Sequence, residues 1–133
     1  MHSTNYYNTL ILASPDSVTL EGKTDFRSGS VAARQYEMIM RSLHLLTSDD
    51  VIFGVFADRN NIVEADRSEA RRRFFSKAQV CLRASPLVKT YGFGIYHDAQ
   101  GHVALCGVEA ARYQELVDRE NVKKIYGMRS KRT

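Results

Sequence analysis

Seven residues between positions 83 and 97 have chemistry suited to holding a small anion. Arg83 and Lys89 are cations, and Ser85 precedes Pro86 in a pattern typical of a helix start. A helix that begins there presents free backbone N–H groups and the positive end of its dipole, both of which attract anions. The candidate ligand-binding residues are Arg83, Ser85, Lys89, Tyr91, Gly92, Gly94 and His97.

The same segment also has a purely structural explanation. Ser85 can cap a helix, and Gly92 can end it. The segment lacks the Gly-Lys-Ser/Thr ending of a Walker loop, and a lone Gly-x-Gly is weak evidence for a dinucleotide site. We expect a binding protein for a phosphate- or carboxylate-bearing ligand, and the structural explanation stays open beside it.

Cys81 suggests a second function, that of an enzyme. Because the thiolate is the effective nucleophile, a catalytic cysteine needs a nearby base. His97 or His44 could be that base, or His97 could act itself, with Tyr91 as the acid–base partner. The sequence does not bring these residues together, so whether the protein is an enzyme, and which residues are catalytic, stays open.

Two histidines flank a four-residue turn at positions 98–101. We expect His97 and His102 to face each other across this hairpin, where Asp98 could help them hold a metal ion. Two imidazoles without a third ligand at a fixed spacing favour an incidental role. We therefore expect neither a metal nor a cofactor.

The charge distribution suggests a third function, that of an interaction module. Residues 1–66 hold 5 Lys/Arg and 9 Asp/Glu (−4), whereas residues 67–133 hold 14 and 6 (+8). The basic half favours an anionic partner, which includes nucleic acid or an acidic protein. Tyr91, Phe93 and Tyr96 could stack on bases, but no RNA-binding signature accompanies them. Nucleic acid is therefore possible but not favoured.

Composition limits the class of protein and its location. The chain has 133 residues, of which 44% are hydrophobic and 26% charged, values typical of one soluble domain. No apolar run approaches the roughly 20 residues that span a bilayer, so we expect no membrane association. Cys81 and Cys106 lack the spacing of zinc or redox pairs, which favours two free thiols in the cytoplasm. The oligomeric state is not determined by these features.

Hydrophobic periodicity and turn signals predict a single α+β domain over residues 1–133. Its sheet is expected to be small and largely antiparallel, built from an N-terminal strand, a C-terminal hairpin and a last strand, and packed with several helices. The predicted strands cover residues 6–13, 93–97, 102–107 and 122–128. The predicted helices cover residues 30–43, 47–59, 66–78, 86–91 and 110–118, although the apolar run from Val51 to Phe56 is also compatible with a buried strand. Residues 14–29 are expected to form a long loop, and residues 129–133 a flexible basic tail.

Several segments together resemble a known protein family. They read MHSTNYYNT, TSDDVIFGVFADRNN, FFSKAQVCLRASPLVKTYGFGIYHD and MRSKR. They are similar to a family of small uncharacterised bacterial proteins, a domain of unknown function, over nearly the full length of the chain. The CLRASPL and YGFGI stretches are the most specific part of the match. The resemblance implies a bacterial, cytoplasmic origin and assigns no activity, cofactor or catalytic residue.

Overall fold

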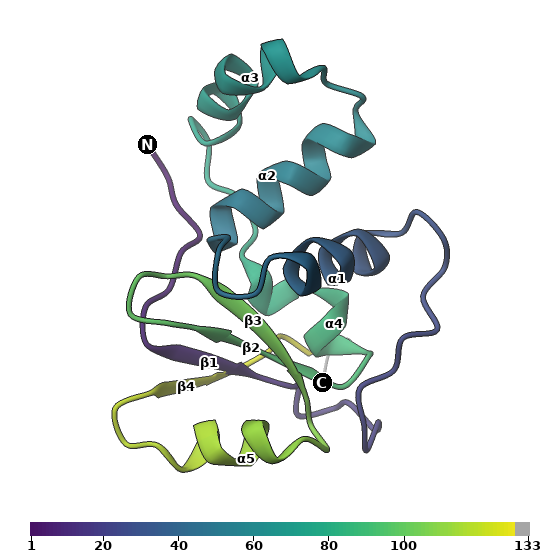
Figure 1. Ribbon diagram of the computed structural model, residues 1–133, viewed down its shortest axis with the longest axis vertical. Helices are drawn as coiled ribbons and strands as arrows, with labels where there is room; N and C mark the ends of the chain where they lie inside the picture. Colours follow the sequence, from purple (N-terminus) through teal and green to yellow (C-terminus); the bar gives the residue numbers. More distant parts are fainter. Residues whose placement is uncertain (130–133) are drawn as a thin grey trace.

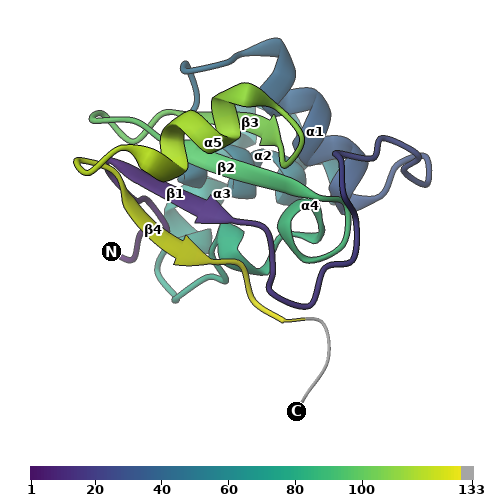
Figure 2. The ribbon, with the colours of Figure 1, turned by 90° about the horizontal axis from the view of Figure 1, so that it is seen from below.

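Four strands form a mixed sheet at the centre of the molecule (Figures 1 and 2). The structure is a computed structural model that describes residues 1–129. The strands are β1 (Thr9–Leu12), β2 (Phe93–His97), β3 (Val103–Gly107) and β4 (Lys123–Tyr126), in the spatial order β3-β2-β1-β4. β2 runs antiparallel to both β1 and β3, and β4 runs parallel to β1. The predicted α+β fold is confirmed.

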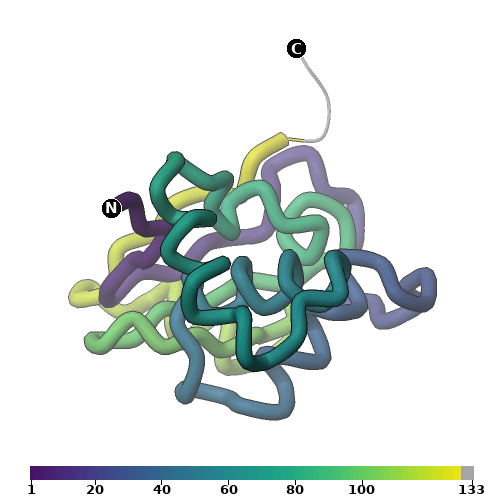
Figure 3. The backbone as a smooth tube through the Cα atoms, turned by 90° about the horizontal axis from the view of Figure 1, so that it is seen from above, coloured from purple at the N-terminus to yellow at the C-terminus, as the bar shows by residue number. Residues whose placement is uncertain are grey.

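Helices cover both faces of this sheet. They are α1 (Val31–Arg41), α2 (Ser48–Arg59), α3 (Arg67–Phe74), α4 (Pro86–Lys89) and α5 (Ala111–Asp118). α5 lies alone on one face, whereas α1, α2 and α4 lie on the other, with α3 packed outside α2 (Figures 1 and 3). No helix within residues 1–129 is long and apolar enough to cross a membrane.

The alternation of side chains along β2 explains these two layers. Phe93, Ile95 and His97 face α1, α2 and α4, and the residues between them face α5. The main core on the multi-helix side consists of Ile11, Ile39, Val51, Leu82, Val88, Ile95 and Val103. The core on the α5 side consists of Leu10, Cys106, Leu116 and Val122.

Short-range capping signals set where three helices begin. The Ser30 hydroxyl caps α1, and Thr47 forms a reciprocal capping box with Asp50 at the start of α2. Ser85 caps α4 by accepting from the Leu87 N–H at 3.1 Å, with Pro86 as the first helical residue. The starts predicted for these helices are confirmed.

α3 ends earlier than the predicted boundary at residue 78. Its last residue is Phe74, and the following backbone turns away. The Ser76 hydroxyl donates to the Arg73 carbonyl oxygen at 2.6 Å and so satisfies an acceptor that another helical turn would have used. From residue 130 onward, the predicted basic tail lies outside the described residues.

Candidate functional site

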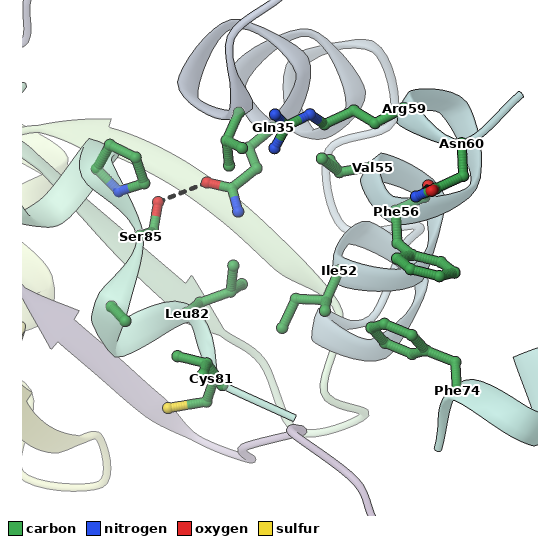
Figure 4. A pocket seen from close by; sticks show the side chains of 14 residues that line it. Gln35, Ile52, Val55, Phe56, Arg59, Asn60, Phe74, Cys81, Leu82 and Ser85 are labelled. Atoms are coloured by element: carbon green, nitrogen blue, oxygen red, sulfur yellow. Dashed lines mark hydrogen bonds between the residues drawn. The ribbon is translucent and has the colours of Figure 1, made fainter. Parts of the chain in front are cut away.

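A cavity of about 440 Å³ lies between α1, α2 and the segment from Cys81 to Pro86 (Figure 4). We call it the α1–α2 pocket. Its walls are mainly apolar and include Ile52, Val55, Phe56, Phe74, Val80 and Leu82. Its polar side chains include Gln35, Arg59 and Ser85. An apolar cleft with a few convergent polar groups is the usual form of a small-molecule site.

Gln35 is the polar side chain at the inner end of this pocket. It lies in α1 and is only 6% exposed. The Ser85 hydroxyl oxygen accepts a hydrogen bond from the Leu87 N–H. The same hydroxyl donates its proton to Gln35 Oε1, at an oxygen–oxygen distance of 2.6 Å. The amino group of Gln35 has no hydrogen-bond partner within the described residues, and Figure 4 shows it turned toward the cavity. The two ring nitrogens of His97 are the buried side-chain atoms without a partner among the described residues, so the Gln35 amino group is reached from the cavity and is available to donate to a ligand or water there.

Arg59 provides the positive charge of the pocket. It is the exposed last residue of α2, and its guanidinium makes no ion pair or hydrogen bond with residues 1–129. Figure 4 shows its side chain reaching along the rim toward Gln35. The described residues that line the pocket include no Asp or Glu, so the cavity has a positive potential.

Of the seven residues predicted to bind a ligand, Ser85 alone lines this pocket. Its hydroxyl is fully used in capping α4 and in holding Gln35. Arg83 donates from Nε to the carbonyl oxygen of Tyr126 at 2.9 Å, which places its guanidinium beside β4. Lys89 is the last residue of α4. The structure therefore does not gather Arg83, Ser85 and Lys89 around the predicted helix start.

The aromatic and glycine candidates contact other parts of the protein. The Tyr91 ring packs edge-on against Phe26, with centroids 4.8 Å apart. Gly92 has a φ of +78°, and a Cβ at this position would lie 2.5 Å from the carbonyl oxygen of Glu21, in the loop between β1 and α1. A Cβ on Gly94 would lie 2.6 Å from the Tyr113 ring, on the α5 side of the sheet. Both glycines are therefore required for packing within the protein.

His97 is fully buried on the opposite side of the sheet from Gly94. Neither of its ring nitrogens has a hydrogen-bond partner among the described residues. Burial lowers the pKa of His97 to about 4, and the nearby Asp98 carboxylate offsets this shift only in part. Its ring lies 5.4 Å from that of Tyr6, centroid to centroid. The imidazole is therefore neutral at pH 7.

The expected pairing of His97 with His102 is wrong. β2 and β3 pair His97 with Val103, and the Asp98 N–H donates to the His102 carbonyl oxygen at 3.0 Å. The Asp98 carboxylate also accepts from the His102 N–H, so these two residues close a shorter turn than predicted. In the described part of the chain, no three His, Cys, Asp or Glu side chains gather where they could hold a metal ion.

Cys81 contacts Tyr6 rather than the predicted partner Tyr91. The Tyr6 hydroxyl lies 3.3 Å from Cys81 Sγ. Burial, reinforced by this contact, raises the pKa of Tyr6 to about 12, so the phenol keeps its proton at neutral pH. A protonated phenol cannot serve as a base for the thiol. Figure 4 also shows the sulfur pointing away from the cavity.

Comparison with known proteins identifies the family of the chain. The model of a family described as "Family of unknown function (DUF6157)" matches residues 1–133. The chain belongs to this family. No curated protein and no solved structure matches it. The resemblance to a domain of unknown function is thus confirmed over the full length.

Sequence reasoning missed the two polar groups that distinguish the pocket of this DUF6157 protein. Gln35 carried a usable signal, because it lies on the apolar stripe of α1 between Ala32 and Ile39, where a polar side chain is unusual. Arg59 carried none, because a cation in the last turn of a helix is ordinary. Its lack of a partner is a property of the folded chain.

Proposed function

We propose that this protein is a small bacterial, cytoplasmic binding protein for an anionic organic ligand that carries a phosphate or a carboxylate. The ligand would occupy the α1–α2 pocket. The observation that carries the proposal is the Gln35 amino group, which belongs to a residue only 6% exposed, has no hydrogen-bond partner within residues 1–129 and is open to the cavity. The Ser85 hydroxyl fixes the other end of this amide, so the amino group is positioned in advance to donate to a ligand oxygen in the cavity.

The charge of the pocket supports an anion. Arg59 lines the rim without a carboxylate partner among the described residues, and no acidic side chain lines the cavity with it. A cation and an amide donor beside apolar walls favour a ligand with an anionic head and an organic body.

The proposed cytoplasmic location is supported by the two thiols. Cys81 and Cys106 are both free, and they belong to opposite sides of the sheet. Cys106 is 9% exposed in the α5-side core, whereas Cys81 contacts Tyr6 on the other side. Unpaired thiols are typical of proteins from a reducing compartment.

A thermal-shift screen with paired variants tests the proposal. Organic phosphates and carboxylates should include compounds that raise the melting temperature of the wild type, because a ligand that binds the native state stabilises it. Arg59→Gln should remove that shift. Arg41→Gln is the matched control, since Arg41 is the exposed last residue of α1 and does not line the pocket. The proposal is wrong if no anion stabilises the protein, or if both variants respond like the wild type.

A further inference from the structure

We infer that the α1–α2 pocket is built for a monocarboxylate with an apolar body rather than for a phosphate ester. The inference rests on the proposed function, because it takes the ligand to be an anion in this pocket. It adds to that proposal the charge of the ligand's head group and the apolar character of the ligand's body. Both are inferred from the charge, the hydrogen-bond donors and the apolar surface of the residues that line the pocket.

The pocket supplies one formal positive charge. Among the described residues that line it, Arg59 is the one charged side chain. Backbone dipoles add less than a full charge, because the starts of α1 at Val31 and of the four-residue α4 at Pro86 are opposed by the end of α2 at Asn60. A phosphate monoester carries a charge close to −2 at neutral pH and would keep about one charge unmatched. A carboxylate is matched by Arg59 alone.

The donors of the pocket also suit a carboxylate. Guanidinium groups bind planar carboxylates through two parallel N–H bonds. A carboxylate oxygen has two lone pairs, so it can accept from Arg59 and still accept from the Gln35 amino group. Ser85 holds Gln35 Oε1, and this bond fixes the amide with its donors toward the cavity. The Gln35 amino group would then have an acceptor in the ligand, which residues 1–129 do not provide.

The walls of the pocket require an apolar ligand body. Phe56 and Val80 are 38% and 70% exposed although both are large and hydrophobic. The Phe56 ring packs against Phe74 at 4.6 Å between centroids, and this pair forms one wall of the cavity. An aryl or alkyl body on these surfaces would remove apolar area from water. A sugar or another polyol would leave its hydroxyl groups against hydrocarbon.

Calorimetric titration of the full chain with three related compounds tests the head group. The probes are 4-phenylbutanoate, its neutral amide 4-phenylbutanamide, and 3-phenylpropyl phosphate, which present similar bodies. The carboxylate should bind most tightly of the three. Arg59→Gln should weaken its binding about tenfold or more, as expected for loss of a charged hydrogen bond. Arg41→Gln should leave its binding unchanged.

A second pair of variants tests the walls. Val80→Ser should weaken 4-phenylbutanoate several-fold and leave the weak binding of acetate unchanged, because acetate has no body to reach this wall. Val18→Ser is the matched control, since Val18 is 90% exposed and does not line the pocket. If Val80→Ser and Val18→Ser had equal effects, an apolar body would not be part of recognition.

The outcomes separate this inference from the proposed function. If 3-phenylpropyl phosphate binds at least as tightly as the carboxylate and depends on Arg59, the monocarboxylate inference is wrong while anion binding stands. If 4-phenylbutanamide binds as tightly as the acid, the charge of the head group is irrelevant and both fail. Both also fail if neither anion binds in a way that depends on Arg59.

Discussion

Acidification should destabilise this protein through His97 well before its carboxylates are protonated. The imidazole is fully buried, and neither nitrogen has a hydrogen-bond partner within residues 1–129. Burial lowers its folded-state pKa to about 4, whereas an unfolded chain would titrate near the ordinary value of 6.5. Between these two pH values the unfolded chain binds the proton more readily than the native state. The free energy of unfolding must therefore fall as the pH falls through this window.

The two pKa values of His97 set the size of the effect. A difference of one pKa unit corresponds to about 1.4 kcal/mol, so the complete shift is worth about 3.4 kcal/mol. Linkage between the two states gives a loss of about 2 kcal/mol from pH 7.5 to pH 5, and of about 3 kcal/mol from pH 7.5 to pH 4. Native domains have only about 5–15 kcal/mol in total, so a loss of this size is easily measured.

Urea unfolding at pH 7.5, 6, 5 and 4 would measure this loss against the His97→Leu variant. The variant should lack this part of the pH dependence. At pH 7.5 its stability should stay within about 1 kcal/mol of the wild type, because leucine removes two unpartnered polar atoms at similar volume. His2→Leu, at an exposed histidine, is the control and should follow the wild type.

The contributions of other titratable groups to the pH dependence of stability are the same in the wild type and in His97→Leu, so they cancel in this comparison. Burial acts to raise the pKa of Asp50, but hydrogen bonds from Thr47 and Arg71 outweigh it and hold that pKa below its usual value. The stability that Asp50 contributes is thus lost at lower pH in both proteins. Parallel curves for the wild type and His97→Leu would refute the reasoning, as would an NMR titration in which the His97 ring protonates near pH 6.5.

Three further predictions concern the backbone and the thiols. Gly92→Ala should destabilise the fold by about 2 kcal/mol or more, because a positive φ and a carbonyl contact at 2.5 Å both oppose a side chain; thermal unfolding measures this. Asp49→Ala should lower the free energy of unfolding by about 2 kcal/mol, because the Asp49 carboxylate accepts hydrogen bonds from both the N–H and the hydroxyl of Thr4 at 2.7 Å. These bonds hold the N-terminal segment, so limited proteolysis near the N-terminus should become faster in the variant. A thiol reagent should modify half-buried Cys81 before Cys106, since burial raises the pKa of Cys106 to about 11; peptide mapping reads the order.

Most of the fold could be predicted because its determinants are local in the sequence. Ser30, Thr47 and Ser85 each specify a helix start through side-chain contacts no more than three residues away. The hairpin was recognisable from its two apolar runs, but its register was not, because Asp98 closes a shorter turn with His102. The parallel pairing of β4 with β1 joins residues more than 100 positions apart, and no local signal encodes it.

The candidate site could be predicted much less well. Ser85 was identified, but for capping chemistry that the protein uses internally. The unpartnered state of the Gln35 amino group depends on Ser85, which lies 50 positions away and holds only the oxygen of the amide. A polar side chain can bind a ligand only through atoms that have no hydrogen-bond partner after the chain has folded. Residue type and spacing in the sequence do not show which atoms these are.

Net charge along the chain also did not locate the free cation of the pocket. The excess of +8 in residues 67–133 is partly used in ion pairs with the acidic half, as between Arg67 and Asp58 and between Arg71 and Asp50. Arg72 pairs with Glu69 within its own helix. Arg59 lies in the acidic half, yet it has no carboxylate partner among the described residues. Pairing across the fold thus leaves fewer cations for a polyanion such as nucleic acid, and one unpaired guanidinium over an apolar cavity favours a small ligand with a single negative charge.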